Sequence, residues 1–163
     1  SFYPSSSTIG VDLNNTNTTA QFTLGTRISG TNDSSWVYVY MSGAASAGAA
    51  CVITATGTAA MATIALAMVP TSQIAFAQSA FTAADYGWLA QSGIAMNMIA
   101  SATTLAVTTG LYVGTVAGHL STTVGSATMV GVQFAGSSAT AASWATTGVL
   151  SFPRIPMANL SDS

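Results

Sequence analysis

The chain has 163 residues, half of them hydrophobic, which is enough for one folded domain with its own core. Only 4% of the residues are charged, against roughly a quarter in ordinary soluble domains. Two arginines and no lysine cannot neutralise a phosphate backbone, which excludes nucleic acid as a partner. The few Asp, His and Cys residues are scattered, so we expect no enzyme, no catalytic or metal site and no cofactor.

The composition divides the chain into three predicted parts. Residues 1–20 are polar and turn-rich, which predicts an extended N-terminal arm. Residues 21–150 carry the apolar, β-favouring segments and form the core domain. Residues 151–163 form an extended C-terminal tail, because the two prolines of FPRIPM favour an extended segment without regular pairing.

In chain order, the core domain is predicted to be a series of short strands separated by Gly-, Ser- and Thr-rich turns. The predicted strands are QFTLGTRI (21–28), WVYVYM (36–41), AACVIT (49–54), MATIALAMV (61–69), QIAFA (73–77), YGWLAQSG (86–93), IAMNMI (94–99), LYVGTV (111–116), ATMVGVQF (127–134) and TTGVLSF (146–152). GTNDSS (30–35) is a predicted turn, and Gly93 is predicted to form another. Strands of this length and spacing predict an all-β fold, a small β-barrel or β-sandwich.

Helix is expected in one or two turns at most, around residues 79–85. The alanine-rich segments 58–68 and 137–145 form short helices in an alternative interpretation, because Ala is the best helix former. Residues 44–69 are uncharged and long enough to span a bilayer. Ser, Thr and Gly dilute this segment and no Lys or Arg flanks it, so we predict strands there and no membrane partner.

The N-terminus, SFYPSSST, has neither the basic start nor the apolar stretch of a secretion signal. Ser1 is also typical of a chain whose initiator Met has been removed. We therefore expect synthesis in the cytoplasm. Cys51, the sole cysteine, lies in an apolar alternation and is predicted to be a buried, inert thiol, and His119 is predicted to be structural.

The segment AADYGWLA (83–90) gathers a carboxylate, a phenol and an indole, but no base or metal-ligand pattern accompanies them. It is predicted to be a structural corner in which Asp85 closes a turn. Gly87 gives the backbone freedom between Tyr86 and Trp88, which share one face of a strand. We expect Trp88 to be largely buried.

The two arginines are the candidate partner contacts. Arg27 either pairs with Asp33 across a hairpin or makes a bidentate contact with a partner. Arg154 lies in the predicted tail, a suitable shape for a segment lying on a partner. We expect the hydrophobic ends of the chain to touch other chains as well, through Phe2, Tyr3, Pro4, Phe152 and Pro153.

Two segments resemble a known family. LGTRISGTNDSSWVYVYMSGAASAGAACVI (24–53) and AFTAADYGWLAQSG (80–93) are similar to segments of the capsid decoration, or cement, proteins of tailed bacteriophages. The resemblance extends over about residues 22–132. It is carried by Gly25, Arg27, Gly30, Trp36, Tyr38, Asp85, Tyr86, Gly87, Trp88 and Gly93.

The resemblance implies a small β-rich structural protein on the outer surface of the virion. Its partners would be the major capsid protein and further copies of itself, with trimers favoured over dimers. Such a protein stabilises the shell against internal DNA pressure, and the family has no catalytic residues to carry over. Many members are richer in Lys and Glu, so hydrophobic contacts and strand addition would carry more of the binding here.

Two other functions fit parts of the sequence. The recurrence of Thr and Ala is compatible with a surface or secreted β-rich adhesin or an ice-binding protein, although the irregular Thr spacing argues against a flat ice-binding array. A minor tail structural protein is the other alternative.

Overall fold

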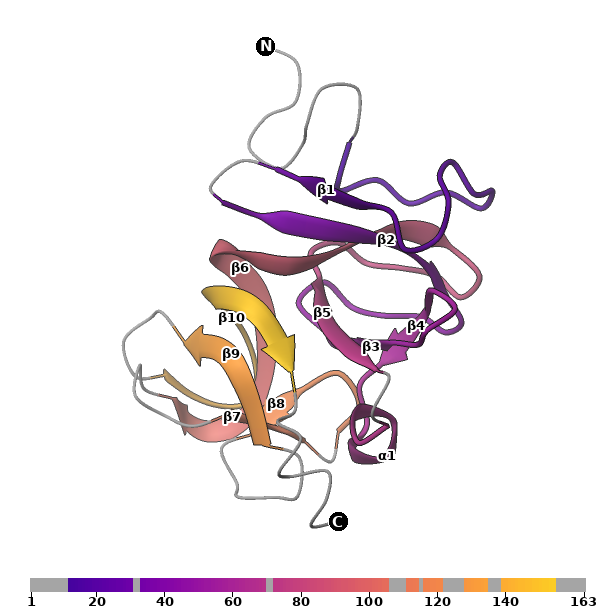
Figure 1. The fold of residues 1–163 in the computed structure, drawn as a ribbon. Coiled ribbons are helices and arrows are strands. Elements are labelled where there is room, and N and C mark those ends of the chain that lie inside the picture. The colour runs from indigo at the N-terminus through magenta and orange to yellow at the C-terminus, as the bar shows by residue number, and fades with distance from the viewer. Residues whose placement is uncertain are drawn as a thin grey trace.

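The computed structural model describes residues 12–30, 33–69, 72–105, 111–114, 116–121, 128–134 and 139–154. Within these ranges the regular secondary structure is almost entirely β-strand and includes a closed five-strand barrel (Figure 1). The predicted all-β class is confirmed, and of the two predicted forms the barrel, not the sandwich, is the one observed. The elements are β1 (Arg27–Ser29), β2 (Ser35–Met41), β3 (Ala50–Ile53), β4 (Thr58–Met61), α1 (Ile64–Ala67), β5 (Gln73–Ala77), β6 (Tyr86–Leu105), β7 (Leu111–Val113), β8 (Leu120–Ser121), β9 (Thr128–Phe134) and β10 (Ala139–Arg154).

Five of these strands close into a barrel. The pairings run from β2 to β4, β3, β5 and β6, and β6 then pairs with the other edge of β2. All of them are antiparallel except the β2–β4 pair. In Figure 1, β2 and the first part of β6 lie above β3, β4 and β5, and the rest of β6 runs downward beside β10. A closed ring of so few strands encloses a narrow interior, which only small and medium side chains can fill.

The interior of the barrel has the composition that this geometry requires. Successive residues of a strand face opposite sides, so alternate positions of the five strands point inward. They form one buried cluster: Val37, Val39, Met41, Cys51, Ile53, Ala59, Ala75, Ala77 and Leu89. Ala45 and Phe81, joined by an isolated bridge, belong to the same cluster. The small residues of the sequence therefore allow the ring to close.

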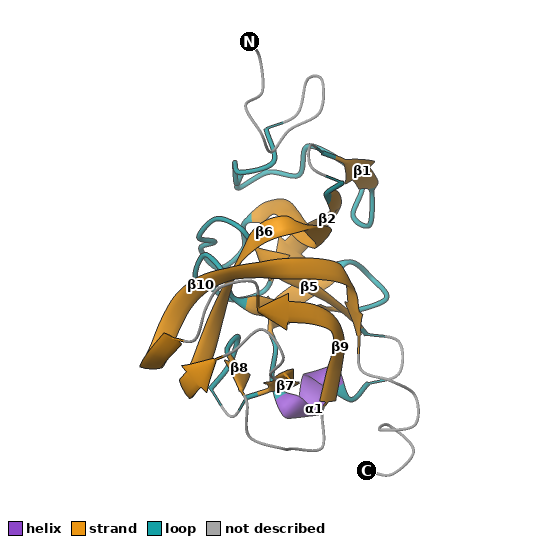
Figure 2. Cartoon of the chain, turned by 90° about the vertical axis from the view of Figure 1, so that its left-hand side faces the viewer, coloured by secondary structure: helices purple, strands orange, loops and turns teal. Residues whose placement is uncertain are grey.

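The long strand β6 belongs to two sets of pairings. Residues 86–92 pair with β2 in the barrel, and residues 92–105 pair with β10. The sheet continues through β9, β7 and β8, and β8 returns to β6 through the parallel pair Ala100↔Leu120. Figure 2 shows β10 as a long strand beside β9. One continuous strand thus joins the barrel to the C-terminal half of the sheet.

An aromatic layer covers part of the outside of the barrel. Trp36, Tyr38 and Trp88 are at most 3% exposed, and Tyr38 lies opposite Trp88 with ring centroids 5.0 Å apart. Phe22 packs on both Tyr38 and Trp88, at 5.3 Å from each. The indole Nε1 of Trp36 donates a hydrogen bond to a buried serine hydroxyl, which satisfies its polar group.

Residues 12–25 hold this layer in place. Leu13 is 1% exposed, and Asn17 forms an isolated bridge with Tyr86. The predicted arm therefore includes a stretch, residues 12–20, that packs against the barrel. Residues 1–11, with Phe2, Tyr3 and Pro4, lie outside the described residues.

The short helix lies in a different segment from the expected one. Residues 79–85 form a turn, whereas α1 occupies part of the segment predicted to be a strand over residues 61–69. The hydroxyl of Thr63 accepts a hydrogen bond from the Leu66 N–H and caps the helix. The alternative interpretation, a short helix within residues 58–68, is therefore the correct one. The described residues contain no helix with the length and hydrophobicity needed to cross a membrane.

The predicted turn at Gly93 is wrong. β6 runs through this position without interruption, and Gly93 has a φ of 146°. The pairing registers with β2 and with β10 both shift close to it. β6 pairs with β2 up to Ser92 and with β10 from Ser92 onward. Gly93 therefore marks the bend at which the strand changes its partner.

Two further boundaries differ from the prediction. Of the strand predicted over residues 21–28, only the last two residues belong to β1. The chain also stays paired beyond residue 151, because Arg154 lies opposite Val130 on β9. The register shift between Leu150 and Arg154 accommodates Pro153, as expected for a proline in a sheet. Residues 151–154 are thus part of β10, although they were predicted to lie in an extended tail without regular pairing. The alternative of a short helix over residues 137–145 is wrong for residues 139–145, which also belong to β10.

Candidate functional site

No cluster of three or more His, Cys, Asp or Glu side chains that could hold a metal ion occurs among the described residues. His119 lies at the turn between β7 and β8, where its carbonyl accepts a hydrogen bond from the Gly114 N–H at 3.0 Å. The surface offers three other features: an arginine cluster, an apolar surface and an aromatic cleft.

Cys51 lies inside the barrel, as predicted, and is fully buried. Loss of hydration on burial raises the pKa of its thiol from 9.0 to about 12, and a backbone hydrogen bond at Ala77 acts in the opposite direction. The unfolded thiol ionises from about pH 9, whereas the folded one stays neutral. The stability linked to Cys51 is therefore complete below pH 9 and is lost as the pH rises toward 12.

This burial predicts an unreactive thiol in the native protein. A pKa higher by three units (12 − 9 = 3) lowers the thiolate fraction near neutral pH about a thousandfold. Iodoacetamide at pH 8, followed by intact-mass spectrometry, should label Cys51 only when urea unfolds the chain. Equal labelling rates with and without urea would show that the barrel opens freely.

The segment AADYGWLA forms the structural corner that its residues predict. The Oδ2 of Asp85 accepts a hydrogen bond from the Thr82 N–H at 2.8 Å, and Asp85 is 8% exposed. Ala84 has a φ of 72°, so the turn holds a residue in the left-handed region. The Met41 N–H donates to the Asp85 carbonyl at 2.8 Å. Asp85 thus closes a turn that is tied to the end of β2.

Gly87 has a different role from the one predicted. It lies on the inner face of β6 opposite Val39, and a Cβ there would lie 2.6 Å from the ring of Phe81. Glycine is therefore needed for space rather than for backbone freedom. Tyr86 and Trp88 share the outer face, as predicted, and Trp88 is 3% exposed.

The arginine cluster consists of Arg27, Gln73 and Gln91. The guanidinium of Arg27 donates hydrogen bonds to the Oε1 atoms of both glutamines, and Gln91 Nε2 donates to Gln73 Oε1 at 3.2 Å. Arg27 lies opposite Val37 and Gln73 opposite Ile53, so the cluster closes one end of the barrel interior.

Arg27 does not pair with Asp33. Among the described residues its partners are the two amides, and no ion pair joins it to the hairpin turn. Of the two alternatives for Arg27, the ion pair with Asp33 is therefore wrong, because Gln91 and Gln73 lie directly across the barrel end. Gln91 is 4% exposed and Arg27 remains exposed, so a fixed guanidinium faces solvent.

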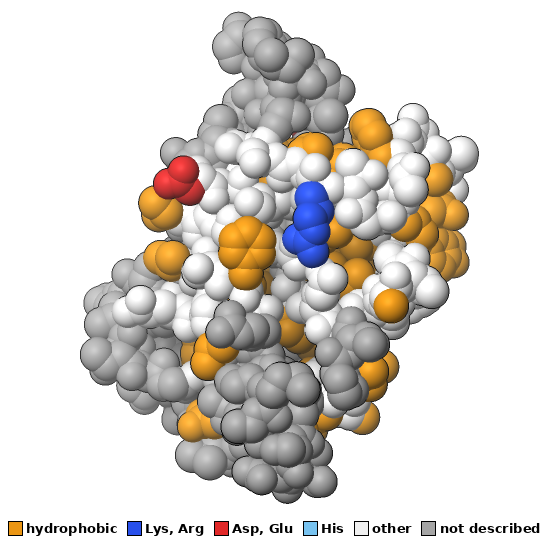
Figure 3. All heavy atoms as spheres, in the orientation of Figure 1, with side chains coloured by type: hydrophobic (Ala, Val, Ile, Leu, Met, Phe, Trp, Pro, Cys, Tyr) orange, Lys and Arg blue, Asp and Glu red, His pale blue; other side chains and the backbone are white. Residues whose placement is uncertain are grey.

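The apolar surface consists of Ile94, Val149 and Phe152, which are 59%, 36% and 50% exposed. Ile94 lies on β6, and the other two lie on the adjacent part of β10, where Leu150 pairs with Gly93. Phe152 has a φ of 48°, which is uncommon for a residue with a large side chain. Charged side chains are sparse on the face shown in Figure 3.

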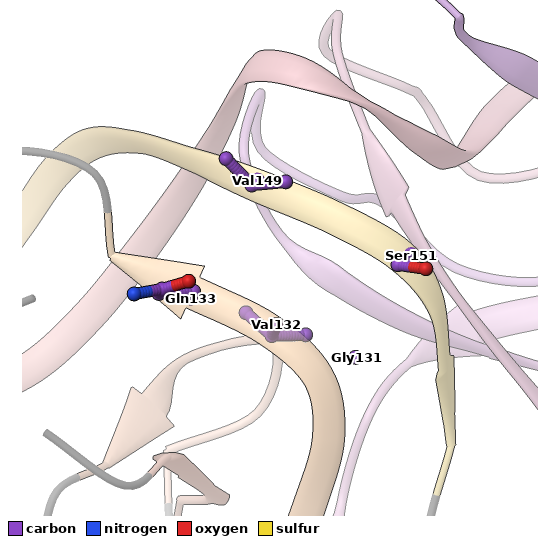
Figure 4. Close-up of a pocket in the computed structure, with 5 residues that line it drawn as sticks. All are labelled: Gly131, Val132, Gln133, Val149 and Ser151. Carbon is purple, nitrogen blue, oxygen red and sulfur yellow. The ribbon is translucent and has the colours of Figure 1, made fainter. Parts of the chain in front are cut away.

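A shallow hollow of about 220 Å³ adjoins this surface between β9 and β10. Figure 4 shows Val149 and Ser151 on β10 beside Val132 and Gln133 on β9. Gly131 completes the lining, and a Cβ at this position would lie 2.5 Å from the Ser151 carbonyl oxygen. Pro153 is buried beside Gly131, and Arg154 is the last residue of β10.

The aromatic cleft is a second hollow of about 220 Å³, on the outside of the barrel. Phe22, Tyr38 and Trp88 line it on one side, and its polar lining consists of Asp12, Asn15, Asn17 and Gln21. The Gln21 N–H donates a hydrogen bond to the Tyr38 hydroxyl at 2.9 Å, which fixes the loop that carries Phe22.

Several residues of these features are not predicted from the sequence. Gln73 is the only polar residue of β5, and Gln91 follows the apolar stretch Trp88–Ala90 of β6, which is a signal that each amide needs a partner. The sequence places Phe22 in a strand, and it places Ile94 in a strand without a role.

Comparisons of the chain with protein-family models, with curated proteins and with solved structures found no match.

Proposed function

We propose that the protein is a structural virion protein that binds the outer surface of a bacteriophage head and stabilises the shell. The observation that carries this proposal is the spatial relation of the two segments that resemble decoration proteins. The β1–β2 hairpin from the first segment pairs with the start of β6 from the second. The motif residues Tyr38 and Trp88 lie opposite each other there, and Arg27 is hydrogen-bonded to Gln91 of the second segment. The two segments that carry the resemblance therefore lie in one structural unit.

Arg27 supplies a contact for the major capsid protein. Its described partners are neutral amides, which orient the guanidinium without offsetting its charge. A planar guanidinium held in this way fits a carboxylate through two parallel hydrogen bonds. An acidic side chain on the shell is the matching group.

The apolar surface supplies contacts between copies of the chain. Ile94, Val149 and Phe152 expose hydrophobic groups on adjacent strands, and the low charge of the protein does not oppose association. A trimer on a local symmetry axis would present several copies of Arg27 to the shell. Weak contacts repeated by symmetry then add up to stable binding.

Binding to heads tests this function directly. Heads of the phage that encodes the chain would be prepared without it, mixed with the purified protein and sedimented. We expect saturable co-sedimentation at a fixed copy number per head, and greater resistance of the heads to heating. A deletion for testing the arm should remove only residues 1–11, because Leu13 and Asn17 pack against the barrel. Failure of the intact protein to bind heads would refute the proposal.

Substitution of Arg27 tests the contact itself. Arg27→Gln should weaken head binding about tenfold or more, because hydrogen bonds to a charged group contribute about 1.5–3 kcal/mol. The matched control is Asp33→Asn on the same hairpin, which also removes one charge and leaves a residue that tolerates the φ of 58°. Equal affinities for the two variants would exclude Arg27 from the interface.

Copy number separates this function from the alternatives. A decoration protein is present in numbers set by the symmetry of the head, whereas a minor tail protein is present in few copies. Quantitative mass spectrometry of purified virions measures this number. An adhesin or ice-binding protein would be absent from virions altogether.

A further inference from the structure

We propose that the aromatic cleft binds a single ring of a neutral carbohydrate. Phe22 offers the aromatic surface, because it is 41% exposed although it packs on two buried rings. Its ring meets Tyr38 at 79° and Trp88 at 58°, with centroids 5.3 Å away in both cases. These contacts fix the ring without covering it. The C–H face of a sugar packs on such a ring, whose face is electron-rich.

The polar lining supplies the complementary groups. Asp12 lines the cleft with a carboxylate, of which Oδ1 accepts the Asn14 N–H at 3.0 Å. Asn15, Asn17 and Gln21 add amides, which both donate and accept. The Nε2 of Gln21 donates to the Thr19 carbonyl at 3.1 Å. Adjacent sugar hydroxyls also donate and accept, so they match a mixed lining of this kind. A phosphate or another anion would instead face Asp12 with no cationic side chain in the lining.

An organic cation is a poorer match for the same cleft. Recognition of a quaternary ammonium group requires several open aromatic faces around it. Tyr38 and Trp88 are 1% and 3% exposed, so among the described lining residues Phe22 alone presents an open ring. The arrangement is a platform with a polar border, which suits a flat ring with hydroxyl groups.

The size of the cleft limits what it can hold. Its volume of about 220 Å³ is below the roughly 300–1,000 Å³ of pockets for drug-sized ligands. One sugar ring therefore enters, and the rest of a glycan would extend into solvent. Binding of one ring is weak, and many copies on one particle would be needed to hold a glycan-coated surface.

The test uses the 163-residue chain without heads, so its outcome does not depend on the proposed function. Methyl glycosides of glucose, galactose, mannose and N-acetylglucosamine would be titrated while NMR records backbone amide shifts. We expect saturable, millimolar binding of at least one glycoside, with shifts at residues 12–22 and around Trp88. Glycerol, a polyol without a ring, should produce no saturable shift.

A matched pair of variants decides whether the platform is responsible. Phe22→Ala should lower the affinity at least tenfold, whereas Val116→Ala removes another half-exposed apolar side chain outside the cleft and should leave the affinity unchanged. Both variants keep the buried core, and far-ultraviolet circular dichroism checks their folding. Equal affinity of Phe22→Ala and the unaltered protein would overturn the proposal. The absence of saturation with every glycoside would also overturn it. Displacement of the sugar by a peptide of residues 1–11 would do the same, because it would assign the cleft to the chain's own N-terminal segment.

Discussion

Replacement of Trp88 by alanine should lower the free energy of unfolding by about 3–5 kcal/mol, the usual cost of removing a buried Trp or Phe. Trp88 is 3% exposed and lies opposite Tyr38, with a centroid distance of 5.0 Å. Its removal leaves a cavity between the barrel and residues 12–25. Because whole domains are stable by only about 5–15 kcal/mol, this single change removes a large share of the total. Urea titration followed by circular dichroism measures it.

Phe22→Ala is the control within the same aromatic group. Phe22 touches Trp88 and Tyr38 but is 41% exposed, so its removal should cost only about 1 kcal/mol. Trp88→Phe should recover part of the loss, since it keeps an aromatic ring in the layer. A loss for Trp88→Ala no greater than that for Phe22→Ala would mean that the aromatic layer does not stabilise the fold.

The strands that the sequence predicts best are those buried on both faces. WVYVYM, AACVIT and QIAFA agree with β2, β3 and β5 to within one or two residues at each end. Each is a short run of apolar and β-branched or aromatic residues bounded by turn residues, a pattern with few competing interpretations. The burial of Trp88 and the turn at Asp85 are also predictable from local sequence. The first follows from hydrophobicity and the second from the turn-forming chemistry of Asp.

Predictions fail where a local pattern has two solutions. Residues 61–69 alternate in a way that suits a strand, but the hydroxyl of Thr63 caps a helical turn there. The partners of Arg27 are not predictable, because Gln73 and Gln91 are 46 and 64 positions away and meet it only when the barrel closes. The aromatic cleft depends likewise on a loop, residues 21–26, that packs back on β2 and β6.

The scarcity of charge is consistent with how this fold is held together. The hydrogen bonds of the arginine cluster join one cation to two amides, and the barrel interior is filled by Ala, Val and other apolar groups. Stability therefore depends on close packing and backbone pairing rather than on ion pairs. Since surface ion pairs contribute little in most proteins, the absence of ion pairs among the described residues costs this fold little stability.

Gly93 is the position where this dependence on backbone geometry can be tested most sharply. Its φ of 146° belongs to a region that residues with a Cβ rarely adopt, at a cost of about 1–3 kcal/mol. A Cβ would also lie 2.1 Å from Met96 Cε and 3.3 Å from Ser34 Cβ. Met96 is flexible enough to move, so the backbone conformation should decide the result. Gly93→Ala should therefore destabilise the protein by at least this amount in urea titrations.

The location of the damage distinguishes this prediction from general destabilisation. Gly93 lies where β6 leaves β2 and continues along β10, so Gly93→Ala should weaken both ladders at once. Hydrogen exchange should accelerate first at residues 90–98, before the amides of β3 and β5. Gly43→Ala is the control, because a Cβ at Gly43 would have no other atom within 4 Å and the residue has no positive φ, and it should change stability by less than about 0.5 kcal/mol. If Gly93→Ala matches Gly43→Ala, the bend tolerates other conformations, and the barrel and the C-terminal half of the sheet are not coupled through it.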